Sequence, residues 1–400
     1  MRTSIRALFL LPVLILALVA IPSVVFSAAG QPQDALAGNT LGDVGQTVPG
    51  GTVPPPTPRP RPPVPTPTPT PGAVSKSAAF IERERIEKVI GDRLSSTIYA
   101  FTEDGYLYRS NRDGYGWLLV TTEPQMTDFI MNAADPNVLY SGSGADCSNP
   151  AAQLAPMYKS TDGGYTWEQL PAAMNLKPLL TDQGNPNHLF AADCTTLYLS
   201  TDGGVTWSPK PAEGDNLWAA YAPAGMASGS LVGEPRPAQP HWEQIFAIGN
   251  SADGVGAVAF SGNLGDSWAN ITRTDAPPMQ ATVVVAHLFD GGKLWVVDEK
   301  GVWATVDYGV NWIHMTEGLK ALTRTNRTAL NALTYGYNGK LFLATDIGLY
   351  EWELGGSSWV KSTDTGFATQ HLTGLLVTES SPRVLWVNSE DGVFTYTVKD

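Results

Sequence analysis

A short motif recurs along the chain and constrains the fold more than any other feature. Residues Ser160–Trp167 read STDGGYTW, and residues Ser200–Trp207 read STDGGVTW. Self-similarity at a spacing of tens of residues is the signature of a repeat architecture rather than of several unrelated domains. Looser or degenerate copies are Ser261–Trp268, Thr305–Trp312 and the two segments that end at Trp117 and Trp359.

A second marker counts the repeats. An aliphatic residue followed by an aromatic one opens a short apolar run seven times, at intervals of 41, 50, 56, 49, 47 and 44 residues. Each repeat holds four short alternating runs separated by turn residues, which predicts four antiparallel strands. The chain is therefore expected to be all-β, a seven-bladed β-propeller, with a six-bladed ring as the alternative. The pairs are Ile98-Tyr99, Leu139-Tyr140, Leu189-Phe190, Ile245-Phe246, Leu294-Trp295, Leu341-Phe342 and Leu385-Trp386.

The two ends of the repeat region bear on how the ring closes. The seventh repeat runs out after Val393–Thr397 and lacks a fourth strand. If the first repeat begins near Ile86, then Ala78–Ile81 remains to supply the missing strand. Pairing the ends in this way removes an open sheet edge. We therefore expect the propeller to occupy residues 78–400.

The motif resembles the Asp-box, or bacterial neuraminidase repeat, of sialidases, sortilin-type receptors and photosystem II assembly-factor propellers. Two copies match the pattern Ser-x-Asp-x-Gly-x-Thr-Trp fully, two are conservative variants and two are degraded. The resemblance covers residues 78–400 and implies a propeller whose Asp-box turns lie opposite the ligand site. It leaves the activity open, because such folds include enzymes and pure binding proteins.

Turn chemistry accounts for each position of the motif. The aspartate or asparagine oxygen can accept N–H groups of its own turn, and glycine adopts backbone angles that other residues resist. We expect the tryptophans to pack between neighbouring blades and the aspartates to be structural rather than catalytic. These structural positions are Ser160, Asp162, Gly164, Trp167, Ser200, Asp202, Gly204, Trp207, Asn263, Gly265, Trp268, Asp307, Gly309, Trp312, Trp117 and Trp359.

The chain has two cysteines, in equivalent loops of adjacent repeats. Cys147 and Cys194 each follow the second strand expected in their repeat. In an oxidising compartment they are expected to form a disulfide, the alternative being a pair of free thiols. With no Cys-x-x-Cys pair, the sequence excludes a four-thiolate zinc site.

Acidic residues gather in the turns between the second and third strands of the repeats. Asp-Gly is favoured in tight hairpin turns, which explains many of them. A propeller nevertheless brings these turns to one face, where they would form a ring of carboxylates that attracts cations or a basic partner. No cofactor is expected; calcium held by two or three turns is the alternative, because no single loop has enough oxygen ligands. The candidate ligand-binding residues on this face are Glu103, Asp104, Asp193, Asp298, Glu299, Asp346, Glu390 and Asp391 in these turns, together with Asp128, Trp218 and Asn331 at the entries of first strands.

The sequence offers no recognisable catalytic set. The Arg-Ile-Pro signature that resemblance to sialidases would imply is absent, and at Arg85–Glu87 a glutamate would oppose an anionic substrate. Nucleophile-elbow, zinc-protease and phosphate-loop motifs are also absent from the sequence. We therefore predict a non-catalytic recognition or assembly module that binds a protein or a glycan, with an exo-glycosidase of the sialidase type as the alternative.

The N-terminal segments predict export. Arg2 and Arg6 precede the apolar run Ala7–Phe26 and then small residues, so residues 1–29 are expected to be a signal peptide or, uncleaved, a membrane anchor. Residues 30–77 are rich in proline and threonine and predict a disordered, extended linker. We expect an extracellular or cell-surface monomer that contacts the membrane only through an uncleaved N-terminal segment.

The net charge bears on the class of partner. The chain carries 38 acidic and 25 basic residues, a formal net charge of −13. A domain this acidic repels phosphate backbones, so nucleic-acid binding is not expected. The partner is instead expected to be a protein or a glycan at the cell envelope.

Overall fold

The structure is a computed structural model that describes residues 74–76, 85–91 and 96–397, apart from short internal segments. The expected leader (1–29) and all of the expected linker except residues 74–76 lie outside the described residues, so those predictions remain predictions. In the described part, no helix is long and apolar enough to cross a membrane. The internal segments left out are 112–113, 115, 122–127, 133, 148, 150–154, 183, 213–214, 229–243, 288–290, 321–327, 337–338, 354, 364–370 and 379–383.

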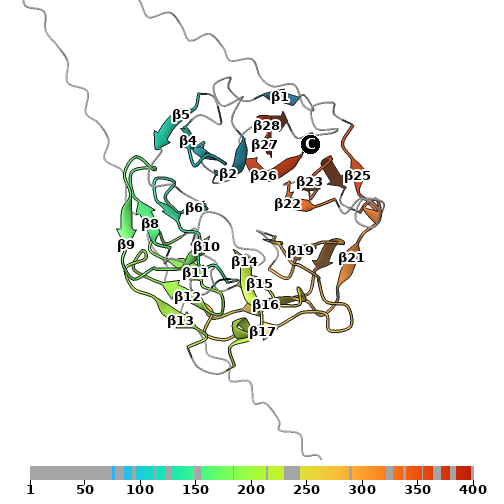
Figure 1. The fold of residues 1–400 in the computed structure, drawn as a ribbon. Helices are drawn as coiled ribbons and strands as arrows, with labels where there is room; N and C mark the ends of the chain where they lie inside the picture. Colours follow the sequence, from blue (N-terminus) through green and yellow to red (C-terminus); the bar gives the residue numbers. More distant parts are fainter. Residues whose placement is uncertain are drawn as a thin grey trace, which may run out of the picture. The chain divides into compact units, whose positions relative to one another are not determined.

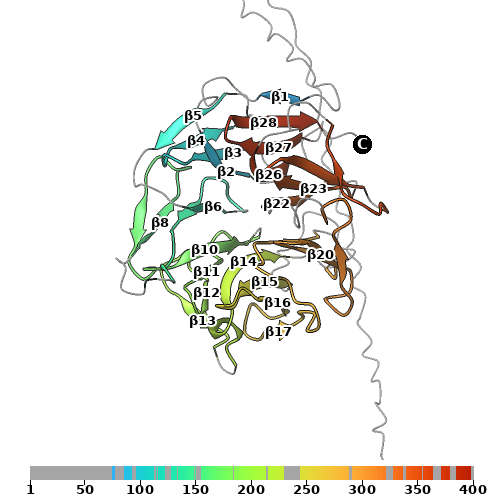
Figure 2. The same ribbon diagram turned by 45° about the vertical axis from the view of Figure 1, so that its right-hand side comes forward.

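The described residues form seven antiparallel four-stranded sheets, one per repeat, which we call blades 1 to 7 in chain order. The prediction of an all-β, seven-bladed propeller is confirmed. Figure 1 shows the blades arranged around a common centre, and Figure 2 shows the strands of blade 3 side by side from β10 to β13. The inner strands of neighbouring blades contact one another all the way round, including β26 with β2, so the ring is closed.

The first two strands of each blade follow the predicted order. The innermost strands are β2 (Ile86–Gly91), β6 (Phe129–Met131), β10 (Lys177–Thr181), β14 (Ala222–Ser228), β18 (Val283–Ala286), β22 (Leu330–Tyr335) and β26 (Leu372–Thr378). The second strands, which contain the aliphatic–aromatic pairs, are β3 (Ile98–Thr102), β7 (Leu139–Ser141), β11 (Leu189–Ala192), β15 (Ile245–Asn250), β19 (Leu294–Asp298), β23 (Leu341–Thr345) and β27 (Val384–Ser389).

The third and fourth strands flank the Asp-box turns. The third strands are β4 (Leu107–Ser110), β8 (Met157–Ser160), β12 (Leu197–Ser200), β16 (Gly256–Ser261), β20 (Gly301–Thr305), β24 (Gly348–Trp352) and β28 (Gly392–Thr397). The outer strands are β5 (Leu118–Thr121), β9 (Glu168–Leu170), β13 (Ser208–Lys210), β17 (Ala269–Asn270), β21 (Ile313–Met315), β25 (Val360–Lys361) and β1 (Val74–Lys76). A 3₁₀ helix, η2 (Leu217–Ala219), precedes β14.

Blade 7 is completed by the N-terminal strand β1, which pairs antiparallel with β28. The chain ends are therefore joined as predicted, but the strand is Val74–Lys76 and not Ala78–Ile81. The register places Val74 opposite Tyr396 and Lys76 opposite Phe394. A three-residue outer strand needs little apolar sequence, which is why the more apolar segment was a misleading guide. This pairing brings residues 74–76 into the ring.

The hydrophobic core lies between blades rather than inside them. Each buried cluster combines side chains from two neighbours; Tyr99 and Phe101 of blade 1, for example, pack against Phe129 and Leu139 of blade 2. Sheets packed face to face bury both faces of each blade. Because the faces of the blades are buried, a ligand can reach only the two ends of the ring, where the turns between strands lie. We call these ends the Asp-box face, formed by the turns between third and fourth strands, and the b–c face, formed by the turns between second and third strands.

Candidate functional site

The carboxylates of the Asp-box turns are engaged within their own turns. In blade 3, Oδ1 of Asp202 accepts the N–H groups of Val205 and Thr206 at 3.0 and 2.9 Å. Oγ of Ser200 donates to the same carboxylate at 2.8 Å and accepts the N–H of Gly204 at 2.8 Å. Gly204 has φ +96°, a conformation that favours glycine. The Asp202 carboxylate is thus bonded within its own turn, while the N–H of Gly203 donates to the carbonyl of Asn187 and the carbonyl of Gly203 accepts from Nζ of Lys159 in blade 2.

These hydrogen bonds keep the Asp-box carboxyls ionised. Bonds from the hydroxyl and the N–H of Thr206 lower the pKa of Asp202 to about 2. Burial tends to raise the pKa of Asp162, but the bonds from Thr166 outweigh it and the pKa is lowered. Backbone and side-chain bonds from Asn311 lower the pKa of Asp307. A carboxylate held in this way is a poor proton donor at neutral pH.

Each Asp-box tryptophan packs between its own blade and the preceding one. Trp167 of blade 2 packs against the cluster that contains Tyr99 and Phe101 of blade 1. The indole N–H of Trp312 donates to the carbonyl of Ile271, across the interface between blades 4 and 5, at 2.9 Å. Six of the seven interfaces hold such a tryptophan; the interface of blades 6 and 7 has Phe342, Leu372 and Phe394 instead. The other five tryptophans are Trp117, Trp207, Trp268, Trp312 and Trp359.

A disulfide joins two adjacent blades on the b–c face. Cys147 and Cys194 are bonded, with Cα atoms 5.5 Å apart, and lie 47 positions apart in sequence. The bond fixes the loop after β7 of blade 2 to the turn after β11 of blade 3. Disulfides of this kind persist in oxidising compartments.

An ion-pair network joins blades 1, 2 and 3 at the same face. Asp128, just before β6, lies 2.7 Å from Nζ of Lys88 in β2 and 2.9 Å from Nζ of Lys177 in β10. Burial tends to raise the pKa of Asp128, but the two ammonium groups outweigh it and the pKa is lowered. This candidate ligand-binding residue is therefore engaged in holding three inner strands together.

Trp218 is a correction to the predicted binding residues. It lies in η2, its side chain is 0% exposed, and its ring packs edge-on against Trp268 at 5.2 Å between centroids. Asn216 caps this turn by accepting the N–H of Trp218 at 3.1 Å. A residue buried in the core between blades 3 and 4 cannot contact a ligand on the surface. The pattern of strand starts placed it near the face but did not reveal its burial.

Several of the predicted acidic residues already have partners within the protein. Asp193 accepts the N–H groups of Thr195 and Thr196 and the hydroxyl of Tyr198. Glu103 pairs with Arg85 at 3.4 Å. The side chains of Asp104, Glu299, Glu390 and Asp391 are exposed. Over the described ranges, no group of three or more His, Cys, Asp or Glu side chains is arranged to hold a metal ion.

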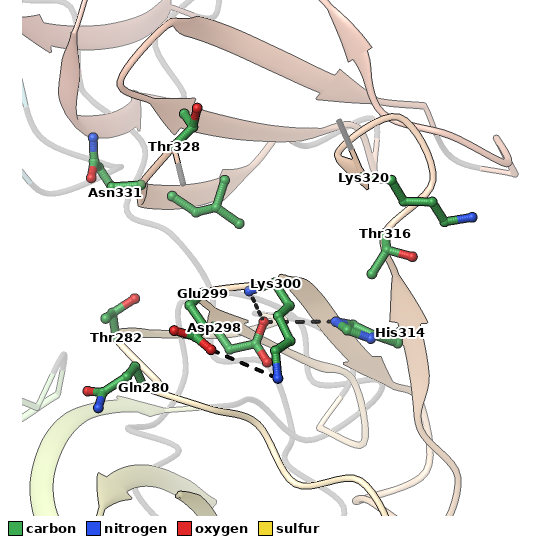
Figure 3. A pocket seen from close by; sticks show the side chains of 12 residues that line it. Gln280, Thr282, Asp298, Glu299, Lys300, His314, Thr316, Lys320, Thr328 and Asn331 are labelled. Carbon is green, nitrogen blue, oxygen red and sulfur yellow. Dashed lines mark hydrogen bonds and ion pairs between the residues drawn. The ribbon is translucent and has the colours of Figure 1, made fainter. Parts of the chain in front are cut away.

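A cleft of about 1030 Å³ opens on the b–c face over blade 5 and reaches the first residues of blade 6. Figure 3 shows its labelled side chains, with Thr328 and Asn331 on one side and Gln280, Thr282 and the residues after β19 on the other. It contains three of the predicted binding residues, Asp298, Glu299 and Asn331. The full lining is Gln280, Thr282, Asp298, Glu299, Lys300, His314, Thr316, Lys320, Thr328, Ala329, Leu330 and Asn331.

Asp298 forms a rigid part of the cleft. Its side chain is buried, and burial tends to raise its pKa, but hydrogen bonds outweigh burial and the pKa is lowered. The ring of His314 stacks on that of Trp303 at 3.9 Å and lies 3.8 Å from Asp298 through Nε2. The donors to Asp298 are the N–H groups of Met279, Lys300 and Gly301 and the indole N–H of Trp303.

The cleft also holds polar side chains with unused hydrogen-bonding capacity. Those of Gln280, Thr282, Thr316 and Thr328 make no hydrogen bond to any other residue in the described part of the chain. Amides and hydroxyls both donate and accept. The charged groups balance one another, since Lys300 lies 3.9 Å from Glu299 and Lys320 pairs with Glu317. The cleft is therefore polar, close to neutral and equipped to bind an uncharged hydrogen-bonding ligand.

These four neutral residues were not among the candidates predicted from the sequence. Three of them precede an inner strand or follow an outer one: Thr282 comes just before β18, Thr316 just after β21, and Thr328 two residues before β22. All such connections return to the b–c face in a four-stranded antiparallel blade. Their positions in the repeat could therefore have placed them on the b–c face, although their residue types gave no indication of a binding site.

Comparison with known proteins identifies the fold. No family description matches the chain, and no curated protein sequence matches it. Among solved structures, the xyloglucanase of family GH74 from Xanthomonas campestris superposes with a TM-score of 0.62 at 16% identity over 81% of this chain. The alignment covers 53% of the xyloglucanase, so the chain spans about half the length of that enzyme.

Two further similar structures are covered almost completely by the alignment. YCF48 from Cyanidioschyzon merolae has a TM-score of 0.56 at 14% identity, covering 82% of this chain and 98% of that one. YCF48 bound to D1 peptide has a TM-score of 0.53 at 17% identity, covering 83% and 96%. At these identities the likeness concerns the fold. The chain is a seven-bladed Asp-box β-propeller that resembles YCF48 and the propellers of GH74 xyloglucanases.

Proposed function

We propose that the chain is a non-catalytic recognition module that binds an extended, uncharged segment of a partner protein in the cleft over blades 5 and 6. The observation that carries this proposal is a cavity of about 1030 Å³ lined by amide and hydroxyl side chains that bond to none of the other described residues. A peptide main chain presents alternating donors and acceptors, which such groups can bind. The peptide complex of a similar propeller, YCF48, supports the choice of a protein segment.

The chemistry of the cleft favours binding over glycoside hydrolysis. A glycoside hydrolase needs a carboxyl group that can donate a proton to the departing oxygen. The pKa of Asp298 is lowered and its oxygens accept four hydrogen bonds, so it is a poor proton donor. Glu299 is the other carboxylate of the lining and pairs with Lys300. We therefore rank the exo-glycosidase second.

The location of the partner follows from the disulfide. The Cys147–Cys194 bond supports an exported protein that acts at the cell surface or outside the cell. Solved extracellular domains are among the similar structures, which agrees with such a location. The partner is accordingly a protein exposed at the cell envelope.

A pair of bulky substitutions tests the cleft. Thr282→Trp fills it, whereas Val205→Trp places the same bulk on the Asp-box face, where Val205 is 62% exposed. Both variants and the parent are applied to a peptide array and an oligosaccharide array. We expect peptide signals that fall at least tenfold with Thr282→Trp and persist with Val205→Trp. Signals confined to sugars, or signals that both variants retain, would contradict the proposal.

A further inference from the structure

A histidine on the b–c face lies between carboxylates from two blades. His371, just before β26, has Nε2 at 3.6 Å from Oδ1 of Asp346 and Nδ1 at 3.4 Å from Oε1 of Glu390. Asp346 follows β23 of blade 6, and Glu390 follows β27 of blade 7. The imidazole thus bridges the one interface of the ring that has no Asp-box tryptophan.

The contacts of His371 with the two carboxylates depend on whether its imidazole is protonated. A charged imidazolium donates from both nitrogens, whereas a neutral imidazole donates from one and presents a lone pair at the other. The charged form can therefore bind Asp346 and Glu390 together, but the neutral form sets one carboxylate against a lone pair. No other charged side chain of the described residues pairs with His371. Histidines change charge between pH 5 and 8.

The bridge is connected to the cleft through Asp346. Its Oδ2 accepts the N–H of Ala329 at 2.9 Å, and its Oδ1 accepts Nδ2 of Asn331 at 3.0 Å. The N–H of Asp346 donates in turn to the carbonyl of Ala329 at 3.3 Å. Ala329 and Asn331 both line the cleft. Asp346 therefore links His371 to Ala329 and Asn331. These two residues belong to the side of the cleft that blade 6 contributes, which we call the blade 6 wall.

We propose that protonation of His371 orders the blade 6 wall of the cleft, so that the site binds its ligand more tightly at mildly acidic pH than at alkaline pH. The part about the ligand rests on the proposed function; the ordering of the wall does not. At low pH the imidazolium holds Asp346 and Glu390 from both sides. At high pH the two carboxylates face a neutral ring and repel each other, which loosens the wall.

Hydrogen exchange of the amides of Ala329 and Asp346, corrected for intrinsic rates, tests the ordering without any ligand. In the parent, their protection should fall about two- to fivefold between pH 5.5 and 8, the effect that an exposed ion pair supplies. His371→Gln should abolish this dependence, and Glu390→Gln should reduce it. Glu103→Gln, a change on the same face in blade 1, should leave it intact.

The outcomes separate this proposal from the proposed function. Protection that does not vary with pH, or that varies equally in His371→Gln, would overturn the proton-dependent wall. Because no ligand is involved, such a result leaves the cleft's recognition role standing. Any peptide selected on the array is then titrated at pH 5.5 and 8; tighter binding at pH 5.5 in the parent and equal binding in His371→Gln is expected, and a dependence of opposite sign contradicts the proposal.

Discussion

The two faces of the ring carry similar acidic turns but use them differently. On the Asp-box face, the carboxylate of Asp202 accepts hydrogen bonds from residues within four positions of itself. On the b–c face, Asp128 pairs with lysines from two other blades, and Asp346 contacts residues that line a cleft. Local bonding makes a rigid repeating unit. Some turns of the b–c face, such as that of Asp193, are bonded locally in the same way, whereas Asp128 joins three blades, so the acidic residues of this face differ from one another.

The largest effect should come from the Asp-box face. Trp207→Ala removes an indole packed against the cluster between blades 2 and 3 and its N–H bond to Gly204 at 3.1 Å. We expect the free energy of unfolding to fall by about 3 kcal/mol or more. Glu299→Ala on the b–c face should change it by no more than about 0.5 kcal/mol. Denaturant titration compares the two, and equal values would remove the contrast between the faces.

A substitution within the Asp-box turn of blade 3 should lower the free energy of unfolding by a smaller amount. Ser200→Ala leaves the buried N–H of Gly204 without its acceptor, because Oγ of Ser200 accepts it at 2.8 Å. The expected loss of unfolding free energy is about 2 kcal/mol, the usual cost of an unsatisfied buried group. Ser208→Ala, an exposed change in β13 of the same blade, serves as the control. A Ser200→Ala protein as stable as the Ser208→Ala protein would show that the turn does not depend on this hydroxyl.

The fold was predictable because its determinants are local and repeated. The aliphatic–aromatic pairs all lie in second strands, and even the degraded copies at Trp117 and Trp359 place their tryptophans between blades. The closing strand was misplaced, since Val74–Lys76 carries no repeat signal and is held by pairing with the far end of the chain. A contact between residues so distant in sequence leaves little trace in either segment.

The binding face was less predictable, because residue type does not reveal what a side chain already contacts. Asp193, Asp298 and Asp346 were chosen as acidic turn residues, but their oxygens accept hydrogen bonds within the protein. Trp218 was chosen for its place at the entry of an inner strand, and it is buried. Thr282, Thr316 and Thr328 are ordinary in sequence and become notable only where two blades bring them around one cavity.

The smallest expected effect distinguishes the two kinds of carboxylate by pH and salt. The pKa of Asp128 is lowered in the folded state despite burial, because two ammonium groups favour its charged form. Its stabilising effect is therefore fully present above the ordinary aspartate pKa, about 3.9, and is lost as the pH falls through the lower folded value. Asp128→Asn should cost about 1 kcal/mol at pH 7, and the difference from the parent should shrink below pH 4.

Salt then separates this network from the Asp-box. Raising the ionic strength should reduce the cost of Asp128→Asn, because the lysines that pair with it are partly exposed and salt screens such charges. The cost of Asp202→Asn should hardly change, since that carboxylate is bound by short hydrogen bonds within its own turn. Unfolding free energies of both variants at low and high salt make the comparison. Equal salt dependence at the two positions would mean that the faces differ in location but not in the way they use their acidic residues.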